Sequence, residues 1–120
     1  MERTKKQIAN TAFWIAALRS GQYQQTTEHL TTVDEDGTNP RHCCLGVACV
    51  IMGKVGTVRG TAVTYDGKND EWGDDEFYRT FGFYNQRQCI LVDMNDAGAG
   101  FHDIADYLES TNTLTGREKV

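Results

Sequence analysis

The sequence predicts a single α+β domain in which helices pack around a buried central helix and beside a small antiparallel sheet. Three observations lead to this fold class. The run from Cys43 to Met52 is apolar on every side, so a helix there must be enclosed by other elements. Amphipathic helical patterns stand near both ends of the chain, and two short β-rich segments joined near Arg59-Gly60 follow the apolar run.

Length and charge limit the possible classes of protein. The 120 residues suffice for one core, so residues 1–120 are predicted to form one domain with an ordered part over about residues 4–110 and a polar tail over 111–120. The net charge of -5 argues against direct binding to nucleic acid. The apolar run is too short to cross a bilayer, and Asn10 and Thr11 interrupt the pattern of a signal peptide, which favours a cytosolic protein.

The elements follow from local signals. Thr4 is placed to cap a first helix that runs through Leu18 and stops at Gly21. The Thr- and Gln-rich stretch 22–33 favours one or two short strands. A turn over 34–40 is expected next, followed by the apolar helix, which ends at Gly53, and by two strands within 55–65. A short helix capped by Asp74 or Asp75 should end at Gly82, and the apolar segment over 89–94 is either helix or strand. A turn over 95–100, in which Asn95 and Asp96 cap the next helix, should lead into a last helix over 101–108.

Five segments resemble a family of small uncharacterised bacteriophage proteins. They are residues 17–26, the Cys-Cys-Leu-Gly-Val-Ala-Cys run at 43–49, Trp72, residues 91–98 with Met-Asn-Asp, and residues 101–109. Met94 stands where the family tends to have Leu, and His102 where a small polar residue is more usual. The resemblance implies a protein made in the cytoplasm of an infected bacterium, and it implies no particular activity.

Cysteine chemistry is one candidate activity. A thiol at a helix N-terminus has its thiolate stabilised by the helix dipole, and Cys43 or Cys44 would occupy that place, with Cys44 as the catalytic candidate. The candidate bases are His29, His42 and His102, and the candidate orienters of the base are Asp96 and Asp103. The alternative is that the cysteines are buried free thiols around a helix whose Gly46 permits close approach of a neighbour. Their spacing does not match a zinc quartet, so we expect no metal ion and no cofactor.

Non-enzymatic binding is the function that the sequence favours. Small size, acidic balance and the phage resemblance predict an inhibitor of a host or defence protein, with an anti-CRISPR protein as the concrete form. The residues predicted to face that partner are Asp34, Asp36, Asp70, Glu71, Trp72, Asp74, Asp75 and Glu76.

Sequestration of a nucleotide signal is a further alternative. Aromatic and cationic side chains after residue 70 could line a pocket for a nucleotide. The residues in question are Trp72, Phe77, Tyr84, Arg79 and Arg87.

Overall fold

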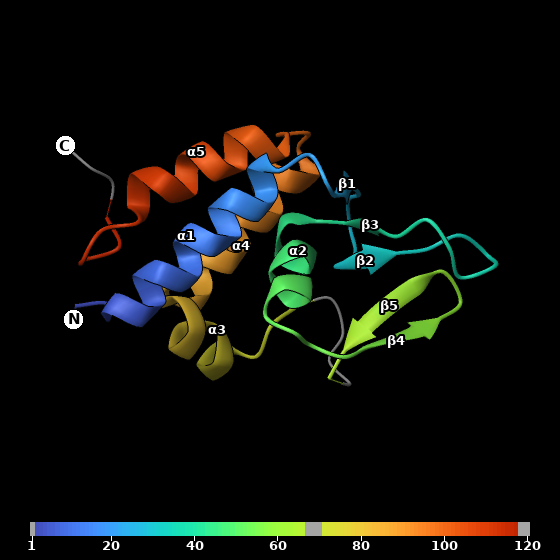
Figure 1. Cartoon of the computed structure of the whole chain (residues 1–120), viewed down its shortest axis with the longest axis horizontal. Helices are drawn as coiled ribbons and strands as arrows, with labels where there is room; N and C mark the ends of the chain where they lie inside the picture. Colours follow the sequence, from blue (N-terminus) through green and yellow to red (C-terminus); the bar gives the residue numbers. More distant parts are fainter. Residues whose placement is uncertain (1, 67–70, 118–120) are drawn as a thin grey trace.

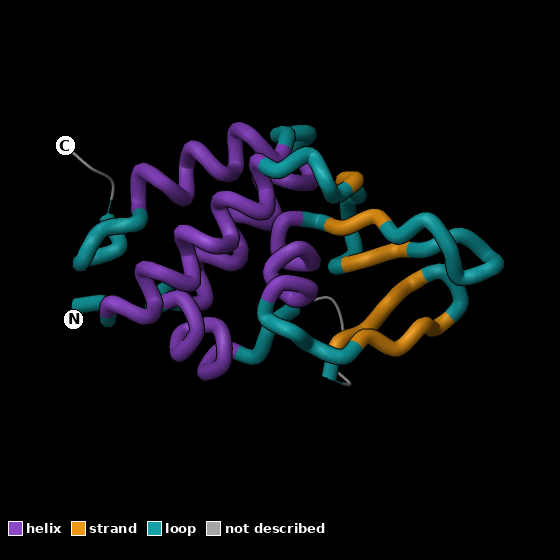
Figure 2. Tube along the Cα trace, in the orientation of Figure 1, coloured by secondary structure: helices purple, strands orange, loops and turns teal. Residues whose placement is uncertain are grey.

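Helices fill one end of the molecule and the sheet fills the other, with α2 between them (Figure 1, Figure 2). The computed structural model describes residues 2–66 and 71–117, and it measures 46 × 26 × 21 Å along its principal axes. The helices are α1 (Lys5–Arg19), α2 (Cys44–Ile51), α3 (Asp74–Phe81), α4 (Asn85–Asp96) and α5 (Phe101–Thr111). They share one hydrophobic core with the sheet, which confirms the α+β class.

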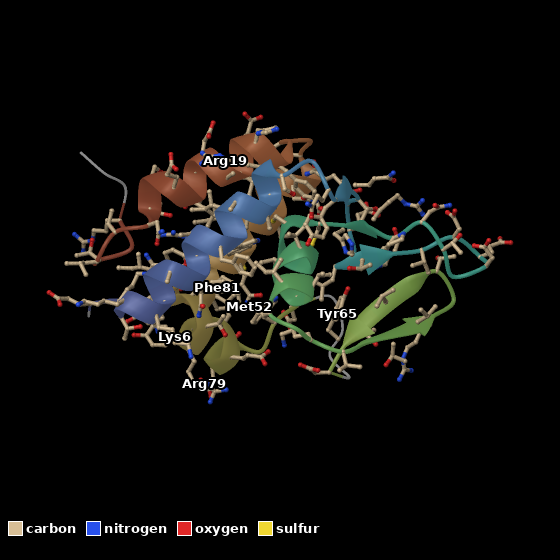
Figure 3. The ribbon with its side chains drawn as sticks, viewed as in Figure 1. Lys6, Arg19, Met52, Tyr65, Arg79 and Phe81 are labelled. Carbon is tan, nitrogen blue, oxygen red and sulfur yellow. The ribbon has the colours of Figure 1, made fainter. Side chains whose placement is uncertain are left out.

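Helix α1 packs against α2, α3 and α5. Its start is the predicted one, because the Thr4 hydroxyl accepts a hydrogen bond from the Gln7 N–H while the Gln7 side chain accepts one from the Thr4 N–H. At its other end Arg19 forms ion pairs with Asp106 at 2.6 Å and Glu109 at 2.9 Å (Figure 3). These pairs are exposed, so packing and not charge holds α1 on α5.

Helix α2 is the buried centre that the sequence predicts. Every residue from Cys44 to Cys49 is buried, and Gly53, at φ +75°, turns the chain away after the helix. The close approach expected at Gly46 is present. A Cβ atom at this position would lie 1.8 Å from the carbonyl oxygen of Leu30, so the segment before β2 runs directly against the helix backbone.

An aromatic cluster joins α1, α2 and α3. The indole of Trp14 donates to the Cys44 carbonyl at 2.9 Å, and that of Trp72 donates to the Leu45 carbonyl at 3.4 Å. The rings of Phe77 and Phe81 pack between them, with the Trp14 and Phe81 centroids 4.6 Å apart. These rings supply much of the buried apolar area of the helical end.

The sheet is mixed, with strand order β1-β3-β2-β5-β4. Its strands are β1 (Gln24–Gln25), β2 (Thr31–Thr32), β3 (Arg41–His42), β4 (Gly56–Arg59) and β5 (Ala62–Tyr65). The hairpin of β4 and β5 confirms the prediction for residues 55–65, with Gly60 at φ +65° in its turn. The expectation of an antiparallel sheet is wrong for one pair. Strand β2 is paired to β3 on one side and β5 on the other, so β1 lies beyond β3 and runs parallel to it.

Two helix boundaries differ from the sequence prediction. Helix α3 is capped by Gly73, and Asp74 and Asp75 lie in its first turn, where their charges face the positive end of the helix dipole. Helix α4 includes the apolar segment that the sequence left undecided. It extends through Asn95 and Asp96, so these residues do not cap α5, whose N-cap is Gly100.

Residues 111–117 fold back onto the N-terminus, where the sequence predicts a polar tail. The backbone N–H of Arg3 donates to the Leu114 carbonyl at 2.7 Å, and its guanidinium donates to Asn112 Oδ1 at 2.9 Å and to the Thr113 carbonyl at 3.0 Å. The last part of the predicted tail, residues 118–120, lies outside the described residues.

Candidate functional site

Three segments that are distant in sequence meet at the side chain of Asn95. This amide is 1% exposed. Its Oδ1 accepts from Gln25 Nε2 at 2.8 Å and from the backbone N–H of Cys44 at 3.2 Å, while its Nδ2 donates to the Thr26 carbonyl at 2.8 Å. Asn95 therefore ties the chain around β1 and the start of α2 to the end of α4.

A pocket of about 110 Å³ lies beside this junction. It is lined by Glu28 and His29 from the β1–β2 connection, Cys43 at the start of α2, and Val92 and Asp96 of α4. The structure thus gathers Cys43, His29 and Asp96, which the sequence offers as a candidate nucleophile, base and orienter.

The backbone of the β1–β2 connection is held in an unusual conformation at this pocket. Glu28 has φ +70°, a left-handed conformation that costs a residue with a side chain roughly 1 kcal/mol or more. Its N–H donates to Asp96 Oδ1 at 3.0 Å, so the α4 carboxylate stabilises the strained turn. Asp96 thereby fixes the backbone one residue before His29.

Cys43 is the N-cap residue of α2. Its backbone is extended, at φ -78° and ψ 175°, and its Sγ accepts from the Gly46 N–H at 3.4 Å. The sulfur therefore lies at the positive end of the helix dipole and takes one of the backbone donors that a helix start leaves unpaired, an arrangement that favours a thiolate. The residue is only 6% exposed, so a reagent reaches it through the pocket.

The other cysteines lie in different environments. Cys44 is fully buried, its thiol donates to the Leu91 carbonyl at 3.6 Å, and burial raises its pKa well above the ordinary value. The structure therefore argues against Cys44 as the catalytic candidate, because burial disfavours its thiolate and leaves no surface that a substrate could meet. Burial raises the pKa of Cys49 to about 12. All four cysteines are free thiols, but Cys89 is exposed and not buried as predicted.

The remaining candidate bases lie elsewhere. His42 is a buried residue of strand β3, where its Nδ1 is 2.7 Å from Thr31 Oγ1 and burial lowers its pKa. His102 and Asp103 are exposed on α5. Within residues 2–66 and 71–117, no group of three or more His, Cys, Asp or Glu side chains is arranged to hold a metal ion.

The acidic residues predicted to face a partner do not form one surface. Asp34 pairs with Arg41 at 3.0 Å in the β2–β3 loop, and its hydrogen bonds with Asn39 and Arg41 lower its pKa. Asp36 accepts from Thr38 in the same loop, which lies at the far end of the sheet from α3 (Figure 1).

The second acidic segment divides into paired and exposed residues. Glu76 is paired with Lys54, which also pairs with Asp66 at 3.0 Å. Asp70 lies outside the described residues, while Glu71, Asp74 and Asp75 are exposed.

The aromatic residues of this region also separate into two groups. Trp72 and Phe77 are 2% and 0% exposed, so Phe77 offers no surface to a partner or a nucleotide, and Trp72 offers only the small part that lines a hollow beside α1. Trp72 belongs to the core and carries Lys54 Nζ 4.4 Å above its ring. Tyr84, by contrast, is 62% exposed, and its ring centroid lies 5.2 Å from that of Tyr78.

Two of the exposed carboxylates and both tyrosines line one hollow, which we call the α3 hollow. It has a volume of about 400 Å³ and is lined by Asp74, Asp75, Tyr78, Tyr84, Asn85 and Gln86. Carboxylates beside tyrosine rings suit a cationic side chain, which can pair with the former and stack on the latter.

A larger hollow of about 520 Å³ opens between α1, the end of α2 and α3. Three cationic side chains line it, those of Lys6, Lys54 and Arg79, together with part of Trp72. Lys6, Met52 and Arg79, which line this hollow, are labelled in Figure 3 on α1, at the end of α2 and on α3. Arg87, the other cation named for nucleotide binding, instead stacks 4.3 Å over the ring of Phe83.

Residues 4–78 match the profile of a domain of unknown function, DUF8296. The chain belongs to this family. The DUF8296 match runs from the cap of α1 into α3, so it contains Cys43 and His29 and ends before Asn95 and Asp96. No curated protein and no solved structure matches the chain significantly. Among the described residues, no helix is both long and apolar enough to span a membrane.

Sequence reasoning missed two residues of the junction in this DUF8296 protein. Asn95 was expected in a turn, and its buried role depends on partners 51 to 70 residues away. Glu28 carries no local signal for positive φ.

Proposed function

We propose that the chain is a phage accessory protein that binds and inhibits a host protein in the bacterial cytoplasm, as an anti-defence factor of the anti-CRISPR kind. The α3 hollow is its contact surface, and the partner presents a Lys or Arg side chain there. One observation carries this proposal: Asp74, Asp75, Tyr78 and Tyr84 line a single exposed hollow. The net charge of -5 and the phage resemblance of the sequence support it.

The chemistry of the hollow suits a protein partner. Tyrosine is enriched at the centres of protein interfaces because it offers a large, stiff surface with one polar tip. Exposed carboxylates accelerate association with a basic partner and select against acidic ones. Tyr78 is half-buried and stacks against Tyr84, so Tyr84 is partly ordered before any partner arrives.

Affinity capture from lysates of uninfected and infected bacteria tests this proposal. We expect one host protein to be retained by the wild-type chain and lost with the double variant Asp74→Lys/Asp75→Lys, and retention to fall as salt is raised. The matched control is Asp93→Lys/Asp103→Lys, which changes the net charge equally at exposed positions on α4 and α5. Equal retention by both variants, or no retained protein at all, would refute the proposal.

Nucleotide sequestration is the second candidate, and the hollow around Lys6, Lys54 and Arg79 favours it. Its volume of about 520 Å³ lies within the range of small-molecule sites, and its cations suit phosphate groups. Lys54 is already paired with Asp66 and Glu76, which leaves Lys6 and Arg79 as the phosphate contacts to test. Protein heated to denaturation should release a nucleotide, and Lys6→Glu/Arg79→Glu should release none. A supernatant without nucleotide would remove this candidate.

A further inference from the structure

We infer that the Cys43 pocket is a reactive thiol site that accepts a small acyl group, with Cys43 Sγ as the nucleophile and His29 as the proton acceptor. This inference is independent of the proposed partner binding, because the pocket and the α3 hollow have no lining residue in common.

The cluster is built from three elements that the fold holds together. Cys43 comes from the start of α2, His29 from the β1–β2 connection and Asp96 from the end of α4. The buried Asn95 amide, directly before Asp96, bonds to the backbone of Cys44, next to Cys43, and to Gln25 and Thr26 at the end of β1, where the connection that carries His29 begins. A nucleophile and a base carried on segments clamped in this way keep their relative position, as nucleophilic catalysis requires.

The charges around the sulfur determine how it ionises. The titratable groups that line the pocket with Cys43 are Glu28, His29 and Asp96. The Gly46 N–H and the α2 dipole favour the thiolate, whereas the two carboxylates and the burial of the side chain oppose it. Asp96 is engaged with the Glu28 N–H, so we treat it as a positioning residue that acts through the turn and not as a base.

The size of the pocket restricts the ligand. A volume of about 110 Å³ equals roughly four water molecules, which is enough for an acetyl-sized group and too little for a nucleotide. Val92 supplies an apolar wall for the methyl end of such a group. The ligand class is therefore a small acyl ester or thioester whose leaving group stays outside the pocket.

The reaction transfers the acyl group to sulfur. His29 takes the proton of the Cys43 thiol, and a sulfur electron pair forms a bond to the carbonyl carbon. The bond from that carbon to the leaving oxygen or sulfur breaks, and the leaving group departs with the electron pair. An alkoxide or thiolate then takes the proton from the imidazolium of His29, so the products are an S-acyl cysteine and an alcohol or thiol.

Acetylation by p-nitrophenyl acetate tests the inference in the intact chain. Peptide mapping by mass spectrometry measures each cysteine separately, so exposed Cys89 serves as the internal reference and buried Cys44 as the negative control. Cys43 should acetylate at least about tenfold faster than Cys89, a threshold set below the roughly 10²–10⁴-fold that a positioned base contributes. Acetylation of Cys43 that is slower than that of Cys89 would overturn the inference.

Substitutions at His29 and Asp96 test whether His29 acts as the base or only supports the structure of the pocket. His29→Asn should slow Cys43 acetylation about tenfold or more while His102→Asn, at an exposed position on α5, leaves it unchanged. Asp96→Asn keeps an acceptor oxygen for the Glu28 N–H and should retain the reactivity that Asp96→Ala loses. If His29→Asn fails to fold, the pH dependence of acetylation in the wild-type chain decides. The acetylation rate of Cys43 should then rise with a midpoint at a lower pH than that of Cys89. Coincident midpoints, or an unchanged rate in a folded His29→Asn variant, would exclude His29 as the base.

Discussion

Replacing Gly46 by alanine should destabilise the fold by about 2–3 kcal/mol, although alanine is the better helix former. The added Cβ would lie 1.8 Å from the Leu30 carbonyl oxygen and 2.7 Å from the Leu30 carbonyl carbon. Both atoms are backbone, so no side-chain rotation relieves the clash and the segment before β2 must move by more than an ångström. That carbonyl also accepts the Cys43 N–H at 2.9 Å, and this hydrogen bond is lost when the segment moves.

The magnitude follows from three contributions. Overpacking a buried contact costs about 1–3 kcal/mol and the lost hydrogen bond about 0.5–1.5 kcal/mol, while the gain in helix propensity returns about 1 kcal/mol. Because the clash is with backbone, we expect a net cost in the upper part of that range and a fall in Tm of about 10 °C. Urea and thermal unfolding followed by circular dichroism measure both quantities.

The control for this experiment is Gly100→Ala. Gly100 has φ -73° and no heavy atom within 4 Å of an added Cβ, so its replacement should change stability by less than about 1 kcal/mol. A Gly46→Ala variant as stable as the wild type, or more stable, would show that helix propensity outweighs the contact and that Leu30 does not lie against α2 in solution.

Three further substitutions test other contacts. Burial lowers the pKa of His42, so the unfolded chain binds more protons below pH 6.5, and the free energy of unfolding should fall as the pH drops from 7 to 5.5. In urea unfolding, His42→Gln should make the free energy of unfolding depend less on pH, and an unchanged pH dependence would contradict a lowered His42 pKa. Arg3 is buried with two hydrogen bonds to the Phe81 carbonyl at 2.7 and 2.9 Å, so Arg3→Lys, which loses the planar fork, should cost about 1–3 kcal/mol, whereas Arg117→Lys at the surface should cost nothing measurable. Asn95→Ala should cost about 2–4 kcal/mol because it leaves buried backbone groups of Thr26 and Cys44 unpaired, and a cost below 1 kcal/mol would show that water replaces the amide.

The hairpin and the helices other than α4 could be predicted because their signals are local, whereas the sequence leaves the apolar part of α4 undecided between helix and strand. Thr4 and Gln7 form a capping box within one turn of helix, and Gly82 at φ +77° ends α3 where a left-handed residue is needed. The uninterrupted apolar run around Gly46 fixed α2 as the centre. Even the close approach at Gly46 was predictable, since a glycine in a buried helix has few other roles.

The site could not be predicted to the same extent because it depends on long-range pairing. Cys43 and Cys44 are adjacent and equally apolar in context, yet one caps α2 beside a pocket and the other points into the core. Trp72 was expected on an acidic surface, but its indole N–H pairs with a carbonyl of α2, 27 residues away. No local pattern distinguishes these outcomes.

The two proposals can be tested against each other because their residues do not overlap. The α3 hollow is made by α3 and the start of α4, and the Cys43 pocket by the β1–β2 connection, the start of α2 and the end of α4. Asp74→Lys/Asp75→Lys should therefore abolish capture of the host protein and leave Cys43 acetylation unchanged, whereas Cys43→Ser should do the reverse. If Cys43→Ser also abolished capture in a chain that remained folded, the thiol would have to form or stabilise the complex, and binding at the α3 hollow alone would no longer explain the function.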